Sequence, residues 1–129
     1  MSDMHFDLTV FEDYRSGNSD ARRLVDEVID GAFSASVSVV TVLQLWKDPS
    51  MNRQTEIMYA SMLSFIEPVP LSIEAAKWAG RWMASLNAEE TNDTMRLALV
   101  AATAKERNEP LCTRFPDRFE EFHIEVIGY

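Results

Sequence analysis

The sequence predicts an α/β fold in three layers, a parallel sheet of about five strands with helices on both faces. Short apolar or β-branched segments alternate with helical segments along the chain, and parallel neighbouring strands need crossover helices of this kind. Residues 97–102 (LALVAA) are apolar on almost every side, which is typical of a helix packed on a sheet and on its neighbours.

The first half of the chain shows the alternation clearly. Residues 4–8 are apolar and predict a first strand, and residues 10–14 predict the start of a helix. Ser19 is placed to cap a second helix, which Gly31 is placed to end. The β-branched residues 36–40 (SVSVV) predict the second strand.

The next elements follow the same logic. Thr41 is placed to cap a short helix through residue 46, and residues 55–65 carry apolar side chains in helical phase. Residues 66–69 predict a third strand. Ser72 is placed to cap a long helix, and Asn92 another that runs through residue 107.

The last two predicted strands are residues 111–113 and 124–127. In open parallel sheets, ligands bind outside the carboxyl ends of the strands. The side chains to inspect are therefore Asp7 and residues 41–44 and 113–118.

The composition of the chain limits the classes of function that are possible. A chain of 129 residues predicts one domain, residues 1–129, and its formal charge of −9 excludes coating nucleic acid by bulk electrostatics. The single cysteine, Cys112, lies in an apolar context and is expected to be buried and unreactive. No apolar run reaches membrane-spanning length and no basic leader precedes an apolar stretch, so we expect no membrane partner and a cytoplasmic protein.

Four segments, in this order, carry a resemblance to a known family. They are residues 7–14 (DLTVFEDY), 36–45 (SVSVVTVLQL), 97–104 (LALVAATA) and 111–119 (LCTRFPDRF). Together they resemble PIN domains, in particular the VapC type of toxin ribonuclease from toxin-antitoxin pairs. The resemblance implies the PIN-like fold and relatives that dimerise and bind an antitoxin, which inserts a peptide near an acidic pocket.

PIN domains work through three or four clustered carboxylates, which this sequence lacks. Of the family's acid positions only Asp7 is an acid; the others are Gln44, Leu97, Phe115 and Arg118. Mg²⁺ and Mn²⁺ need several oxygen ligands, preferably anionic ones. We therefore expect no cofactor and at most a weak metal remnant at Asp7.

The main hypothesis is a degenerate PIN-like domain that has lost metal-dependent ribonuclease activity and acts as a binding or assembly module. It would form a dimer and bind an antitoxin-like protein or peptide. The alternative is an active Mg- or Mn-dependent endoribonuclease that combines Asp7 with the displaced acids Asp93 or Asp117, or with Glu12. A second alternative is a structural homodimer without ligand.

Other charged residues have two interpretations each. Arg114 and Arg118 are expected at the mouth of the pocket, where they pair with Asp7 or Asp117 or contact phosphate, so RNA binding stays open. Asp13, like Glu12, is expected on an exposed helix face. His5 and His123 lack metal-ligand spacing and are expected at the surface or on an edge strand.

Overall fold

The computed structural model describes residues 2–86 and 92–129. The strands are β1 (Met4–Phe6), β2 (Ala35–Ser38), β3 (Glu67–Val69), β4 (Leu111–Cys112) and β5 (Val126–Ile127). The helices are α1 (Leu8–Ser16), α2 (Ser19–Ile29), α3 (Val39–Trp46), α4 (Arg53–Leu63), α5 (Ile73–Leu86), α6 (Asn92–Glu106) and the 3-10 helix η1 (Pro116–Phe122).

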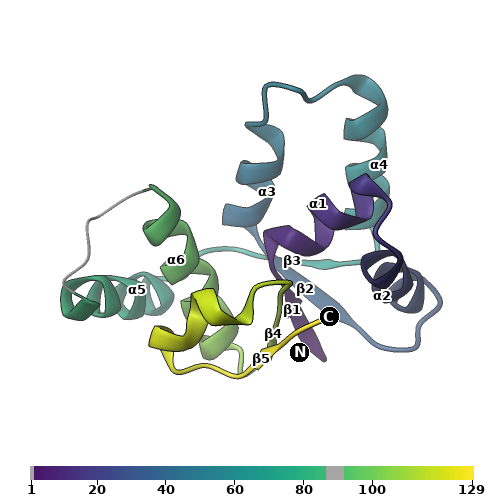
Figure 1. Ribbon diagram of the computed structural model, residues 1–129. Coiled ribbons are helices and arrows are strands. Elements are labelled where there is room, and N and C mark those ends of the chain that lie inside the picture. Colours follow the sequence, from purple (N-terminus) through teal and green to yellow (C-terminus); the bar gives the residue numbers. More distant parts are fainter. Residues whose placement is uncertain (1, 87–91) are drawn as a thin grey trace.

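The strands form one parallel sheet in the order β3-β2-β1-β4-β5, so β1 lies at its centre. Figure 1 shows helices on both sides of this sheet, with α1, α2 and α4 on one side and α5 and α6 on the other. The predicted α/β class is confirmed. Among the described residues, no helix combines the length and the apolar character needed to cross a membrane.

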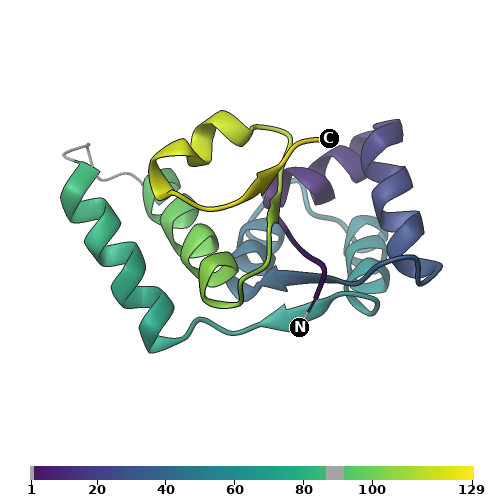
Figure 2. The same ribbon diagram turned by 90° about the horizontal axis from the view of Figure 1, so that it is seen from below.

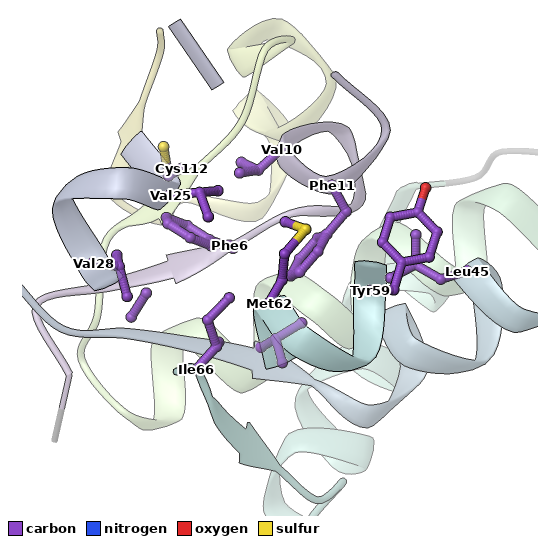
Figure 3. Close-up of a cluster of buried hydrophobic side chains, with 12 residues drawn as sticks. Phe6, Val10, Phe11, Val25, Val28, Leu45, Tyr59, Met62, Ile66 and Cys112 are labelled. Carbon is purple, nitrogen blue, oxygen red and sulfur yellow. The ribbon is translucent and has the colours of Figure 1, made fainter. Parts of the chain in front are cut away.

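Alternating strand residues divide the core into two clusters. Phe6 of β1 packs with Phe11 and Met62 on the side of α1 and α4 (Figure 3), whereas Leu111 of β4 belongs to the cluster of α5, α6 and η1. Cys112 is buried in the first cluster, as predicted. Burial, followed by the nearby negative charge of Asp7, raises the pKa of Cys112 to about 12, so the thiol stays protonated.

Two strands, β1 and β2, end two residues earlier than the sequence predicts. The Oγ atom of Ser38 accepts the N–H of Val40 at 3.1 Å, so Ser38 caps α3 and residues 39 and 40 are helical. Thr41, the predicted cap, is buried inside α3. Leu8 is likewise the first residue of α1, with Asp7 at its N-cap. Strand propensity at residues 39 and 40 is overridden because the Ser38 side chain caps a helix there, whereas the Asp7 side chain makes no capping hydrogen bond to α1.

The starts of α2, α5 and α6 were predicted to within one residue, whereas α4 begins at Arg53, two residues before the predicted start at residue 55. Asn18, rather than Ser19, caps α2 by accepting the Ala21 N–H at 3.0 Å. Ser72 caps α5 as predicted, accepting the Ala75 N–H at 3.0 Å. α6 begins at Asn92 itself, and the residue before it lies outside the described part of the chain.

η1 was not predicted at all. It follows β4, packs against α6 in the view of Figure 2, and places Phe119 and Phe122 in the second core cluster. Pro116 at its start fixes a helical φ angle.

Candidate functional site at the carboxyl edge of the sheet

Asp7 lies at the carboxyl end of the central strand and is almost fully buried, with 1% of its surface exposed. Its Oδ1 atom accepts a hydrogen bond from Nη1 of Arg96 at 3.2 Å. Its Oδ2 atom accepts the Thr113 hydroxyl at 2.8 Å and the Thr9 hydroxyl at 3.4 Å. Residues from α1, α6 and the end of β4 thus occupy both oxygens of the one acid that the PIN resemblance retains.

Arg96 is the main residue that sequence reasoning missed. Its side chain is 6% exposed, and besides Asp7 it contacts the exposed carboxylate of Asp93, with Nη2 3.5 Å from Oδ1. A buried guanidinium needs a buried counter-charge, and Asp7 supplies it. The available signal was an arginine three residues after Asp93 in a helix that is otherwise largely apolar in its centre.

Three shallow clefts surround Gln44. One of about 180 Å³ is lined by Glu12, Gln44 and Tyr59 between α1, α3 and α4. A second, of about 210 Å³, is lined by Gln44, Lys47, Asp93 and Arg96, and the third lies between α3 and α6. Gln44 and Arg96 share two of these clefts, and Asp7 is bonded to Arg96. The structure therefore brings two predicted site positions, Asp7 and Gln44, to the same arginine.

Two of the three remaining predicted acid positions, Leu97 and Phe115, lie elsewhere. Leu97 is half-buried and packs against the second core cluster. Phe115 is 40% exposed; its backbone N–H donates to the Thr113 hydroxyl at 3.2 Å, but its ring lies beneath the guanidinium of Arg118, 4.4 Å from the ring centroid. Neither side chain lines the three clefts around Gln44.

The prediction that Arg114 pairs with Asp7 or Asp117 is wrong. Arg114 Nη1 donates instead to Oδ1 of Asp13 at 3.2 Å, and the Tyr129 hydroxyl donates to Oδ2 at 2.7 Å. Asp13 is correspondingly buried, against the expectation of an exposed face, because the last residue of the chain packs over it. Arg118 has no carboxylate partner among the described residues and stacks on Phe115 instead.

The displaced acids do not assemble around Asp7. Within the described ranges, no group of three or more His, Cys, Asp or Glu side chains is placed to hold a metal ion. Asp93 and Asp117 are exposed. Partial burial raises the pKa of Glu12; the positive charge of Arg96 opposes the rise and the negative charge of Asp7 adds to it. With both Asp7 oxygens engaged and a guanidinium beside them, these residues do not fit Mg²⁺ or Mn²⁺.

A second polar cluster lies at the amino edge of the same sheet. Glu109 accepts the Ser36 hydroxyl at 2.9 Å, Nε of Arg107 at 2.6 Å and the Ser2 N–H at 2.7 Å. The Nδ1 atom of His5 lies 2.7 Å from Ser36 Oγ. The prediction that His5 is at the surface is wrong: it lies on the central strand and is fully buried, whereas His123 is exposed.

The histidine in this cluster is neutral. Burial lowers the pKa of His5 to about 4, against the opposing charge of Glu109. Because Ser36 donates to Glu109, its oxygen accepts from Nδ1–H of His5, and Nε2 has no partner among the described residues. Hydrogen bonds from Arg107, Ser36 and Ser2 outweigh the effect of burial and lower the pKa of Glu109. Because Ser36 and His5 are fully buried and bonded within the cluster, we expect the cluster to contribute to stability.

Comparisons with known proteins agree with this architecture. The sequence matches no family model and no curated protein. The fold is similar to that of a chain in the solved structure of VapBC2 from Rickettsia felis bound to a promoter DNA fragment, with a TM-score of 0.79, 14% identity and 97% of each chain covered. It is also similar to a chain of a toxin-antitoxin complex from Klebsiella pneumoniae, with a TM-score of 0.75, 18% identity and 98% of each chain covered. A chain of FitAcB from Neisseria gonorrhoeae matches with a TM-score of 0.71 and 18% identity, over 97% of this chain and 96% of that one.

These similarities confirm the resemblance in its structural part. The chain has a PIN-like fold of the VapC type, with a five-stranded parallel sheet between helices. At identities of 14–18% they establish the fold alone.

Proposed function

We propose that this protein is a PIN-like domain of the VapC type that has lost metal-dependent ribonuclease activity and binds a protein partner, an antitoxin-like protein or peptide. The observation that carries the proposal is the buried ion pair between Arg96 and Asp7. The guanidinium of Arg96 neutralises Asp7, the one acid that the chain retains at the acid positions of the family.

The physical argument rests on charge. A divalent ion in an oxygen-ligand site needs several anionic or neutral oxygens to offset its lost hydration. Here Gln44 offers a neutral amide, and Asp7 is already engaged by Arg96 and Thr113. To bind a metal at Asp7, Arg96 would have to leave its partner, and an unpaired buried charge costs several kcal/mol.

The partner is proposed from the fold. The solved structures of similar fold include complexes described as VapBC, FitAcB and toxin-antitoxin, which supports an antitoxin-like partner for this chain. The homodimer and the cytoplasmic location stay predictions. So does RNA contact, for which the exposed Phe115 ring with Arg114 and Arg118 is the nearest stacking and phosphate-binding surface.

A cleavage assay tests the loss of activity. Purified protein is incubated with a single-stranded RNA and Mn²⁺, beside the Asp7→Asn variant. We expect the same RNA decay in both samples, because no metal-bound water is generated. Manganese-stimulated cleavage that disappears in Asp7→Asn would overturn the proposal and favour the active nuclease. Sedimentation equilibrium of the same sample measures its molar mass and so tests whether the protein forms a dimer.

A further inference from the structure

A groove between α3 and α6 lies beside the Arg96–Asp7 pair and has apolar walls. Its volume is about 240 Å³, and Val40, Leu43, Met95 and Leu99 line it. Leu43 is 60% exposed and Met95 47%. Large apolar side chains left this open on facing helices are typical of an interaction surface.

The charged residues that line the groove are all cations. They are Lys47 from α3 and Arg96 from α6. Lys47 is exposed and has no ion-pair partner in the part of the chain that the structure describes. Asp7, which neutralises Arg96, is buried behind it. On a protein with a formal charge of −9, Lys47 is thus the one charge lining the groove that no carboxylate of the described residues balances.

We infer that the groove binds an acidic, apolar peptide segment of the partner, with carboxylates at Lys47 and Arg96 and apolar anchors between Leu43 and Met95. Charge complementarity selects this chemistry over a basic segment. The inference rests on the proposed function and specifies its ligand: the loss of acids at the site predicts a ligand with acids of its own.

A second copy of the chain fits the groove less well. In a two-fold dimer the same patch faces itself, so an unpaired Lys47 would lie on both sides of the interface. Like charges facing each other across an interface oppose association. The net charge of −9 on each chain adds to the repulsion.

Asp93 provides a further test of the charge of the ligand. Its carboxylate is 65% exposed and reaches Arg96 only at 3.5 Å, a long contact for an ion pair. A carboxylate of the ligand can replace it on the outer side of Arg96, while Asp7 keeps the inner side. Removing the charge of Asp93 should therefore tighten binding, whereas reversing the charge of Lys47 should weaken it.

Binding is measured with three short fluorescein-labelled peptides that share one pattern of leucines and differ only in their polar positions, which are Glu, Lys or Gln. Fluorescence anisotropy gives the affinity at low and high salt. We expect the Glu peptide to bind tightest and to weaken with salt. Lys47→Glu should weaken it by about tenfold, and Asp93→Asn should tighten it by about threefold. The matched control, Lys77→Glu on the exposed face of α5, should leave the affinity unchanged.

Methionine-methyl NMR locates the peptide independently of charge. The Met95 methyl signal should shift on titration, whereas that of Met4 on β1 should not. The inference would be overturned if the Lys peptide bound tighter than the Glu peptide, if Lys47→Glu left the affinity unchanged, or if no peptide bound. A dimer that dissociates in Leu43→Asp would also overturn it. None of these results restores nuclease chemistry, which only manganese-dependent cleavage would show, so the two proposals fail separately.

Discussion

The two ends of the central strand carry the same kind of interaction in different surroundings. At the amino edge, Glu109 accepts hydrogen bonds from three residues, and one of these, Ser36, is hydrogen-bonded to the buried His5. At the carboxyl edge, Asp7 meets Arg96 beside clefts that surround Gln44. Both carboxylates are buried and both are paired with arginine. The first pair lies within a hydrogen-bond network that ties the sheet together, and the second borders a surface where a ligand can bind.

The contrast shows how a buried charge pair can have two roles. Around Glu109 the partners come from β1, β2, the approach to β4 and the first residues of the chain, so the cluster contributes to stability. Around Asp7 the guanidinium of Arg96 supplies the positive charge that faces the buried acid, and we propose that it stands where relatives would hold a metal. Breaking each pair in turn separates the two roles.

The largest effect is expected from Glu109→Ala. The change leaves Arg107 and Ser36 without their buried acceptor, which should lower the free energy of unfolding by about 4 kcal/mol. Urea denaturation measures the loss. Glu120→Ala, an exposed carboxylate on η1, is the control and should stay within about 0.5 kcal/mol of the unmodified protein. A loss below about 1 kcal/mol for Glu109→Ala would refute the structural role.

Arg96→Met should cost slightly less, about 3 kcal/mol at neutral pH, because it leaves Asp7 buried without its cation. The hydrogen bond from Thr113 remains, which limits the loss. The double variant Arg96→Met with Asp7→Asn should recover part of it, since no buried charge then remains. Equal instability of the single and double variants in urea would contradict a direct pairing.

Stability should fall as the solution is acidified, through His5. The folded-state pKa of His5 is about 4 against an ordinary value of 6.5, so between these values the unfolded chain binds the extra proton. The stability is complete above pH 6.5 and should decrease by about 2 kcal/mol on acidification to about pH 5. In His5→Gln this slope should be absent. A slope of the same size in that variant would assign the effect to other groups.

The smallest effect is expected from Arg118→Ala. The guanidinium stacks on the exposed Phe115 ring, and exposed cation–π contacts contribute about 0.5 kcal/mol. Urea denaturation should therefore barely distinguish this variant from the unmodified protein. A loss of several kcal/mol would show that the loop after β4 depends on this stack.

The sequence predicted the parallel sheet, the order of strands and helices apart from η1, and the position of Asp7, since these follow from periodicity and capping. It did not predict Arg96. Neighbouring positions on a helix point about 100° apart, and a sequence motif cannot say whether residue 96 or residue 97 faces the strand end. The resemblance directed attention to Leu97, but in the structure Leu97 packs on the second core cluster while Arg96 reaches Asp7.

His5 was misjudged for a related reason. A polar residue on a short strand favours an edge or surface position, unless partners from distant segments satisfy it. Ser36, the partner of His5, lies 31 residues further along the chain, and Glu109, the partner of Ser36, lies another 73 residues beyond it. Such long-range satisfaction of a buried group cannot be seen in local sequence patterns.

Calorimetric titration with Mn²⁺ shows whether Arg96 has taken the place of a metal at Asp7. We expect the unmodified protein to show no saturable binding tighter than about millimolar, and Asp7→Asn to give the same weak heats. Micromolar binding by the unmodified protein that disappears in Asp7→Asn would contradict it, because an ion would then be displacing the guanidinium from the acid it neutralises.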